Sequence, residues 1–322
     1  MTRVLVTGAN GFVGSVLSKQ LVDEGFKVRG AYRSRTKADS CPNNIEKAIV
    51  GEINSNTDWQ EALQEVNNVI HLAARVHVMQ ETEIDPLSAF KAVNTEGTLN
   101  LAEQAASSGI KRLIFLSTVK VNGEQSEKVY SASDEVNPDD SYALSKWLAE
   151  QGLQTIREKS GMEIVIIRPP LVYGPQVKGN FLRLIKLIHK GLPIPLASVK
   201  NRRSMVSIDN LCDLIKTCLL HTKANGEVFL VSDGHDLSTP ELIRLIANSL
   251  QKSAKLLPFP VQWLYLLASL VHKRQEVERL CGSLQVDIEK NREILGWHPP
   301  FTVSEGFRKT VAEYLRHKPI GN

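Results

Sequence analysis

Short runs of β-branched and other apolar residues alternate with longer segments in which apolar residues recur every three or four positions, from residue 3 to about residue 168. The short runs predict buried strands and the longer segments predict amphipathic helices, which together indicate βαβ units. The predicted strands are Arg3–Thr7, Lys27–Tyr32, Lys47–Val50, Asn68–Leu72, Arg112–Ser117 and Glu163–Arg168. Right-handed crossovers between them predict an α/β fold with a Rossmann-type, doubly wound parallel sheet.

The regular alternation ends at Pro169 and Pro170, where a mixed stretch rich in Pro, Gly and basic residues begins. A helix at Asp209–His221 and a strand at Glu227–Val231 fit the first domain again, whereas Thr239–Leu250 and the following segments do not. We therefore predict a Rossmann domain at 1–169, which 206–233 rejoins. The segments 170–205 and 234–322 form a smaller mixed α/β lobe.

Composition excludes several classes of protein. Hydrophobic residues make up 42% of the 322 residues and charged residues 23%, as in ordinary globular chains, so disordered and fibrous classes are excluded. The formal charge of +4 has its basic residues spread along the chain, which argues against nucleic acid as a partner. The four cysteines show neither C-x-x-C pairing nor a neighbouring His at ligand spacing. We expect no metal site, no disulfide framework and a cytoplasmic location.

The most apolar later stretch is 256–271. Pro258, Pro260 and Gln262 interrupt it, and it is shorter than the ~20 residues that span a bilayer. We predict a helix that belongs to the core or walls a pocket. The alternative is a helix lying at a membrane surface, because the basic sequence His272-Lys273-Arg274 follows directly.

A glycine-rich loop follows the first predicted strand. The sequence Thr7-Gly8-Ala9-Asn10-Gly11-Phe12-Val13-Gly14 ends that strand and opens a helix. Glycines in this position allow a tight turn and a close approach of the backbone to a pyrophosphate at the helix N-terminus. The loop predicts dinucleotide binding.

The end of the second predicted strand bears on which dinucleotide binds. An acidic residue there accepts hydrogen bonds from a ribose 2′-hydroxyl, whereas a basic residue can pair with a 2′-phosphate. Tyr32 fills this place, and Arg33 and Arg35 follow it. Arg33 favours NADP over NAD, although NAD stays open, and Glu52 with Ile53 after the third strand are candidate adenine contacts.

Tyr142 and Lys146 stand four residues apart, on one face of a predicted helix. A tyrosine that acts as an acid or base needs its pKa lowered from about 10, and a nearby cation can do this. The strand that ends at Ser117 and Thr118 brings a hydroxyl that could bind the same substrate oxygen. These groups predict proton transfer at a hydroxyl or carbonyl.

Taken together, these residues resemble the extended short-chain dehydrogenase/reductase family, in its nucleotide-sugar epimerase/dehydratase branch. The resemblance covers nearly the whole chain. Besides Gly8, Gly11, Gly14, Ser117-Thr118, Tyr142 and Lys146, the matching segments are Val69–Ala74, Asn94–Thr98, Arg168–Pro175, Arg203–Asp209 and Leu295–Pro299.

The resemblance implies a role for each matching position. Tyr142 would exchange a proton with a sugar hydroxyl, Lys146 would hold the nicotinamide ribose and tune Tyr142, and Thr118 would orient the sugar oxygen. A UDP-sugar would contact Asn180 and Arg203, with Arg75 and His77 facing the cleft. The implied coenzyme contacts are Gly8, Gly11, Phe12, Val13, Gly14, Arg33, Glu52, Ile53, Leu72, Ala73, Ala74, Asn94, Tyr142, Lys146 and Pro169. By the same analogy, 87–107 and 141–159 would build a homodimer interface.

Departures from the family pattern narrow the reaction. The branch's 4,6-dehydratases carry Asp-Glu after the Ser-Thr pair, where this chain has Val119 and Lys120. The segment Val119–Gly123 resembles a UDP-glucose 4-epimerase-like subgroup. We expect a UDP-sugar 4-epimerase or 4-keto-reductase that supplies surface-polysaccharide precursors, such as those of lipopolysaccharide O-antigen. A non-catalytic NAD(P)-sensing module and a reductase of small ketones stay open as alternatives.

Overall fold

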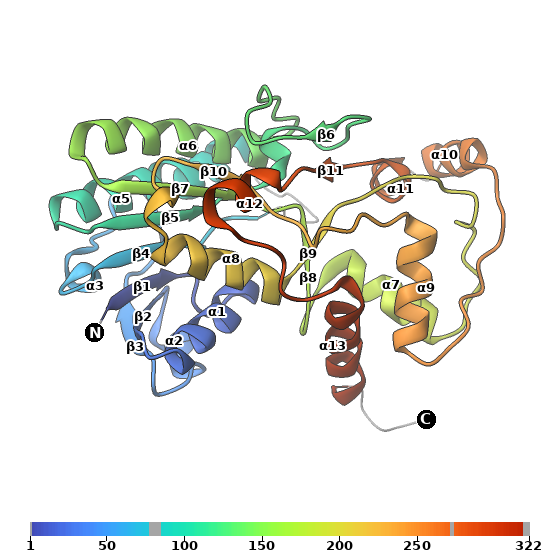
Figure 1. Cartoon of the computed structure of the whole chain (residues 1–322), viewed down its shortest axis with the longest axis horizontal. Helices are drawn as coiled ribbons and strands as arrows, with labels where there is room; N and C mark the ends of the chain where they lie inside the picture. The colour runs from blue at the N-terminus through green and yellow to red at the C-terminus, as the bar shows by residue number, and fades with distance from the viewer. Residues whose placement is uncertain (1, 77–84, 271–273, 318–322) are drawn as a thin grey trace.

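A seven-stranded parallel sheet forms the centre of the molecule (Figure 1). The computed structural model describes residues 2–76, 85–270 and 274–317. The strand order is β10-β7-β5-β4-β1-β2-β3, with every neighbouring pair parallel. The strands are β1 (Arg3–Thr7), β2 (Lys27–Tyr32), β3 (Glu46–Ile49), β4 (Asn68–His71), β5 (Arg112–Leu116), β7 (Glu163–Arg168) and β10 (Val228–Leu230). This order confirms the predicted Rossmann-type fold.

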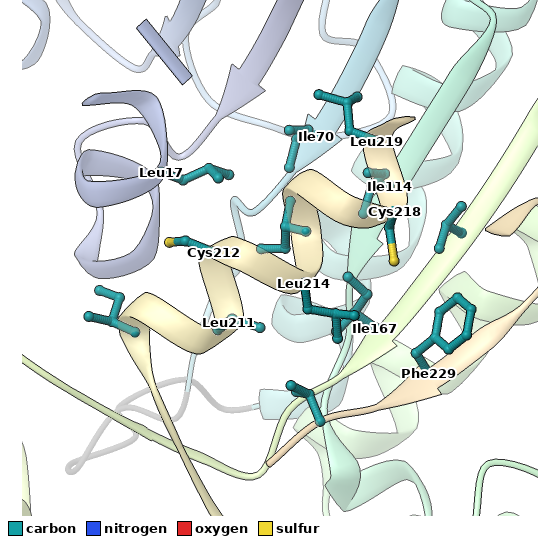
Figure 2. Close-up of a cluster of buried hydrophobic side chains, with 14 of the residues drawn as sticks. Leu17, Ile70, Ile114, Ile167, Leu211, Cys212, Leu214, Cys218, Leu219 and Phe229 are labelled. Carbon is teal, nitrogen blue, oxygen red and sulfur yellow. The ribbon is translucent and has the colours of Figure 1, made fainter. Parts of the chain in front are cut away.

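Helices cover both faces of this sheet, as alternating side chains require. Val4 and Val6 of β1 point to one face, and Leu5 points to the other. The first face packs on α1 (Phe12–Asp23) and α8 (Ile208–Leu220), and Figure 2 shows α8 lying along it with Leu211, Cys212 and Leu214 buried. On the second face lie α3 (Gln60–Leu63), α5 (Gly97–Ser107) and α6 (Ser141–Ser160). We call the sheet with these helices the sheet body.

The remaining sheet-body elements are short. They are α2 (Arg35–Asp39), α4 (Pro86–Lys91), the π-helical turn η1 (Ala92–Glu96), the 3₁₀ turns η2 (Val119–Val121) and η3 (Thr222–Ala224), and α12 (Glu289–Leu295). The predicted helix at 87–107 is thus three pieces, because a π-helical turn separates α4 from α5. The other predicted strands and helices of the sheet body have ends within about one residue of prediction, whereas the apolar helix expected at 256–271 begins only at Val261.

A second group of helices, the outer lobe, lies beside the carboxyl ends of the strands (Figure 1). It contains α7 (Gly179–His189), α9 (Thr239–Ser249), α10 (Val261–Leu270), α11 (Arg274–Cys281) and α13 (Val303–Arg316). Two small parallel sheets join it to the body: β8 (Leu171–Tyr173) with β9 (Met205–Ser207), and β6 (Val129–Tyr130) with β11 (Gln285–Val286). Its core contains the stacked rings of Tyr173, Phe181 and Phe307, with Tyr173 and Phe307 centroids 4.5 Å apart.

Helix α10 is the least buried apolar element of the outer lobe. Of its ten residues, all described, Ala268 alone is buried. Trp263, Leu266, Leu267 and Leu270 expose 51–72% of their surface. Across the described residues, no helix has the length and apolar character needed to cross a membrane. The predicted core or pocket-wall helix is therefore a helix with most of its apolar surface in solvent, and Val271 lies outside the described residues.

Candidate active site

The glycine loop after β1 is built for close backbone contact. Gly8 has a φ of +66°, and a Cβ added to it would lie 3.0 Å from the Ala73 nitrogen. A Cβ on Gly14 would lie 2.1 Å from the Gly8 carbonyl oxygen, and one on Gly11 3.0 Å from the same oxygen. Helix α1 begins after Gly11 without a side-chain cap, so its first N–H groups stay available. These residues fit the pyrophosphate of a dinucleotide.

A buried hydrogen-bond chain links this loop to β4. The Thr7 hydroxyl lies 2.7 Å from His71 Nδ1 and accepts from the Leu72 and Ala73 N–H groups at 3.1 Å. The Thr98 hydroxyl lies 2.9 Å from His71 Nε2 and donates to the Asn94 carbonyl. Because the Thr98 hydroxyl already donates to Asn94, it accepts a hydrogen bond from His71. His71 is therefore a neutral imidazole that donates from Nε2. Burial, with the positive charge of Lys146, lowers the pKa of His71 to about 3.

Asn94 occupies the π-helical turn η1 and connects three segments. Its amide donates to the Arg75 carbonyl at 2.9 Å and to the Ser145 hydroxyl at 3.0 Å, while its oxygen accepts from the Arg75 N–H at 2.8 Å. The Arg75 guanidinium lies 5.6 Å from the centre of the Phe90 ring. Asn94 therefore fixes the loop after β4 against helix α6. π-Helical turns of this kind are frequent at functional sites.

The predicted ribose and adenine positions lie at the ends of β2 and β3. Tyr32 is buried against Gly30, so its ring belongs to the sheet-body core and not to a ribose contact. Arg33 is exposed and pairs with Glu52 at 3.0 Å, which brings together two of the predicted coenzyme residues. A Cβ on Gly97 would lie 2.6 Å from Ile53, so α5 packs directly on the predicted adenine position.

Tyr142 and Lys146 lie on one face of α6, as their spacing predicts. Lys146 is 1% exposed, and its ammonium lies 4.2 Å from the centre of the Phe115 ring. Burial lowers the pKa of Lys146 to about 7, although Glu150 opposes this change. Burial, aided by the charge of Asp140, raises the pKa of Tyr142. The expected lowering of the Tyr142 pKa is thus wrong for the protein alone, because desolvation outweighs any effect of Lys146.

The hydroxyls of Thr118 and Ser117, at the end of β5, have different hydrogen-bond partners. Thr118 caps η2, where its hydroxyl accepts from the Lys120 N–H at 3.3 Å. Ser117 donates to the Glu150 carboxylate, which also forms a buried ion pair with Arg168. The Arg168 guanidinium donates further to the Asn122 side chain at 3.0 Å. Ser117 is therefore committed to this buried cluster, and Thr118 is the hydroxyl at the strand end.

Charged side chains connect α6 to the outer lobe. Lys120 pairs with Asp140, the cap of α6, at 2.8 Å and with Glu124 at 3.1 Å. Glu124 in turn pairs with Arg279 of α11 at 3.0 Å. Arg203 donates to the Arg279 and Gly282 carbonyls at 2.9 and 3.0 Å. The predicted substrate residue Arg203 is thus joined through α11 to the helix that carries Tyr142.

The other predicted site residues lie farther from this cluster or form part of its backbone. The Pro169 carbonyl accepts from the Val119 N–H at 3.0 Å. Phe12, Val13, Leu72, Ala73 and Ala74 are half-buried around the glycine loop. Asn180 is exposed in the first turn of α7, where Arg183 donates to it at 3.4 Å, and it is not among the contacts of Arg203. His77 lies outside the described residues.

Sequence reasoning missed the buried residues that hold the site in place. Glu150 was detectable, because Tyr142, Lys146 and Glu150 follow one another at four-residue spacing on α6. His71 was named only as part of a matching segment. Thr7, Ser145 and Arg168 gave no separate signal, since each acts through partners that are distant in the sequence.

Comparison with known proteins agrees with this geometry. Residues 4–232 match the model of the NAD dependent epimerase/dehydratase family. The chain is 46% identical over 97% of its length to a UDP-glucose 4-epimerase of Vibrio cholerae, 95% of which is covered. It is 28% identical to the N-acetyl-alpha-D-glucosaminyl-diphospho-ditrans,octacis-undecaprenol 4-epimerase of Escherichia coli O157:H7, over 98% of this chain and 96% of that one.

The fold matches solved structures as well. The crystal structure of UDP-glucuronic acid 4-epimerase from Bacillus cereus in complex with NAD superposes with a TM-score of 0.79, at 22% identity, over 98% of this chain and 99% of that one. The predicted dependence on a nicotinamide dinucleotide is confirmed by the family, which is described as NAD dependent, whereas the preference for NADP through Arg33 stays a prediction. Because the family model matches more than half of the chain, the chain belongs to the NAD dependent epimerase/dehydratase family of enzymes.

Proposed function

We propose that this enzyme is a UDP-sugar 4-epimerase, with 4-keto-reduction as the alternative reaction of the same site. The observation that carries the proposal is the placement of half-buried Tyr142 and buried Lys146 on one face of α6, beside the Ser117-Thr118 strand end. The 46% identical relative from V. cholerae is named a UDP-glucose 4-epimerase, which favours epimerisation over reduction.

The proposed roles follow from the positions of the side chains. Tyr142 as the phenolate takes the proton of a sugar hydroxyl and, as the resulting phenol, returns it, and Thr118 orients the sugar oxygen. Bound NAD supplies a hydride acceptor and, in its oxidised form, a positive charge. Lys146 can hold a ribose hydroxyl from its buried position. Gly8, Gly11 and Gly14 admit the coenzyme pyrophosphate to the N-terminus of α1.

Dehydration at the sugar is disfavoured by what surrounds Thr118. Val119 is 3% exposed and has no proton to give, and Lys120 is engaged by Asp140 and Glu124. An added acid and base are therefore missing from the two positions where a dehydratase needs them. Transient oxidation and return of the hydride need neither group.

A second candidate substrate is a sugar diphosphate carried on a polyprenol. The E. coli relative is named for such a compound, and its reaction is a 4-epimerisation too. The exposed apolar helix α10 in the outer lobe favours this candidate, because a polyprenol is a hydrocarbon. Both candidates present the same sugar diphosphate to Thr118, Tyr142 and Lys146.

The position of the substrate, the domain limits, the oligomeric state and the cellular role are part of the same proposal. We place the sugar nucleotide in the outer lobe, with Arg75, Asn180 and Arg203 as substrate contacts. The proposed domain limits are the predicted ones, with 206–233 completing the coenzyme domain, except that α12 of the predicted lobe segment packs on β10 of the sheet body. We expect a homodimer through α5 and α6 and a cytoplasmic enzyme of surface-polysaccharide synthesis. All four cysteines are free thiols, in keeping with a reducing compartment.

The deciding experiment identifies the nucleotide released from the purified protein and then follows two substrates. UDP-N-acetylglucosamine should be isomerised without net change in reduced coenzyme. Stoichiometric oxidation of added NAD(P)H by the 4-keto-6-deoxy sugar would replace epimerase by reductase. A thermal shift with UDP separates a nucleotide-sugar site from a reductase of small ketones. Bound coenzyme without turnover of any sugar would favour a non-catalytic module.

A further inference from the structure

Helix α10 exposes an apolar surface that nothing in the described chain covers. Trp263, Leu266, Leu267 and Leu270 are 56%, 54%, 51% and 72% exposed. Leu257, in the loop that leads into the helix, is 50% exposed. Single exposed leucines are ordinary, but five large apolar side chains within fourteen residues form an interaction surface.

Acidic residues are missing from two segments that contribute to the outer lobe. Residues 164–208 contain eight Lys and Arg and no Asp or Glu, and residues 242–275 contain five and none. The basic residues are spread along the chain as expected, yet the acidic ones are not. Because the formal net charge of the whole chain is +4, these two segments have a strongly positive net charge and the rest of the chain has a negative one.

The two segments meet at a bridge in the loop that leads into α10. Ile194 and Leu256 form a parallel bridge, in which the Ile194 N–H donates to the Lys255 carbonyl and the Leu257 N–H donates to the Ile194 carbonyl, both at 2.9 Å. Lys190, Lys252 and Lys255 are exposed around this bridge, and Lys252 donates to the His189 carbonyl. The basic side chains therefore lie near Leu257, the exposed apolar residue of the loop that leads into α10.

We propose that α10 and these lysines dock the outer lobe on an anionic phospholipid surface. An apolar helix face inserts into the boundary between headgroups and acyl chains, and neighbouring lysines pair with anionic headgroups. Trp263 is the residue type that prefers this boundary. A second copy of the same surface would bring like charges together, so charge complementarity favours lipid over self-association.

The docked helix connects to the active site through α11. Helix α10 packs on α11, whose Arg279 pairs with Glu124, and Glu124 pairs with Lys120 at the cap of the catalytic helix α6. A membrane contact at α10 therefore places the substrate side of the site near the lipid surface. The docking itself does not depend on which sugar diphosphate the enzyme accepts.

The test is co-sedimentation of the full-length protein with vesicles. Vesicles with about 30% phosphatidylglycerol should bind the protein, and pure phosphatidylcholine vesicles should bind it much less. The double variant Leu266→Glu/Leu270→Glu should weaken binding ~10-fold or more, because both carboxylates would enter the apolar boundary. Lys190→Gln/Lys255→Gln should weaken it several-fold at about 0.1 M salt and by less at about 0.5 M.

Matched controls lie in the sheet body. Leu220→Glu changes a leucine that is 64% exposed at the end of α8, and Lys19→Gln/Lys159→Gln removes the same charge from exposed sites. Both controls should bind vesicles as the wild type does. UDP-sugar turnover without vesicles should be unchanged in the α10 variant, so that a failure of the proposed reaction and a failure of docking are separately visible.

Three results would overturn the proposal. The first is no binding to anionic vesicles at low salt. The second is equal binding by the wild type and the α10 double variant. The third is a concentration-dependent oligomer, measured by light scattering, that the α10 variant abolishes while vesicle binding is absent; this result would make a second copy the occupant.

Discussion

The cluster around Glu150 in the sheet body and helices α10 and α11 in the outer lobe differ in how deeply their charged and apolar residues are buried. In the body, Glu150 and Arg168 are 2% and 3% exposed and pair inside the structure. In the lobe, the pair Arg274–Glu278 lies at the surface, and the leucines of α10 are in solvent. Buried charges need complete partners and therefore fix geometry, which suits reacting groups. Exposed groups are free to meet another surface.

The largest expected effect is on turnover in the body. Tyr142→Phe should lower kcat by ~10² to 10⁴, because a positioned acid or base contributes that much. The phenyl ring keeps the edge contact with Phe90, whose centroid is 6.0 Å away, so thermal stability should hold. Steady-state kinetics measure the change. Tyr314→Phe in the lobe is the control and should keep kcat; near-normal turnover of Tyr142→Phe would remove Tyr142 from the mechanism.

Next comes a loss of stability at the buried ion pair. Glu150→Gln leaves the Arg168 guanidinium buried without a counter-charge, which should cost about 3–5 kcal/mol of unfolding free energy. Urea denaturation measures it. Glu278→Gln, the lobe counterpart, should cost no more than about 1 kcal/mol. Equal losses in the two variants would show that the body and the lobe do not differ as described.

Lys146 should give the body a characteristic pH dependence. Its pKa falls from 10.5 to about 7 on folding, so between these values the unfolded chain binds more protons at this site than the native chain. The free energy of unfolding should therefore rise with pH across this window more steeply in the wild type than in Lys146→Met. Denaturation at several pH values provides the two slopes, and identical slopes would contradict the burial of a titrating lysine.

The smallest effect is expected at Arg33, an exposed residue of the body. Its pair with Glu52 has side chains 70% and 64% exposed, so Arg33→Ala should change the unfolding free energy by less than about 1 kcal/mol. If the burial of an ion pair, and not the region it belongs to, decides its contribution to stability, the Arg33–Glu52 pair should behave like the exposed pairs of the outer lobe. The same variant should weaken NADPH more than NADH. Equal weakening of both in coenzyme titrations would return the preference to NAD.

Much of the sheet body could be predicted because parallel strands are buried on both faces and appear as continuous apolar runs. All six strands predicted before Pro169 exist, each with limits within about one residue. The small sheets were missed for a physical reason. β6 and β11 have two residues each and pair across about 155 positions, so no local periodicity marks them.

The active-site residues could likewise be predicted only where a local sequence pattern marks them. Tyr142 and Lys146 were predictable from spacing on one helix, and Gly8, Gly11 and Gly14 from their place after a strand. Tyr32 fills the sequence position where an acidic residue would contact the ribose, and its ring folds back over Gly30 into the core. The partners of Glu150 come from the end of β5 and from β7, and only the folded chain brings Ser117 and Arg168 to one carboxylate, with Asn122 bonded to Arg168.

The position of β10 at the edge of the sheet has a consequence for synthesis on the ribosome. β10 pairs with β7, and α8 packs on α1, yet the chain between β7 and α8 belongs to the outer lobe. The first 168 residues therefore emerge with the part of the sheet face that α8 covers still exposed. Translation adds about 5–20 residues per second, so this face waits several seconds for α8 and β10. During that interval the nascent chain is a natural client for a chaperone.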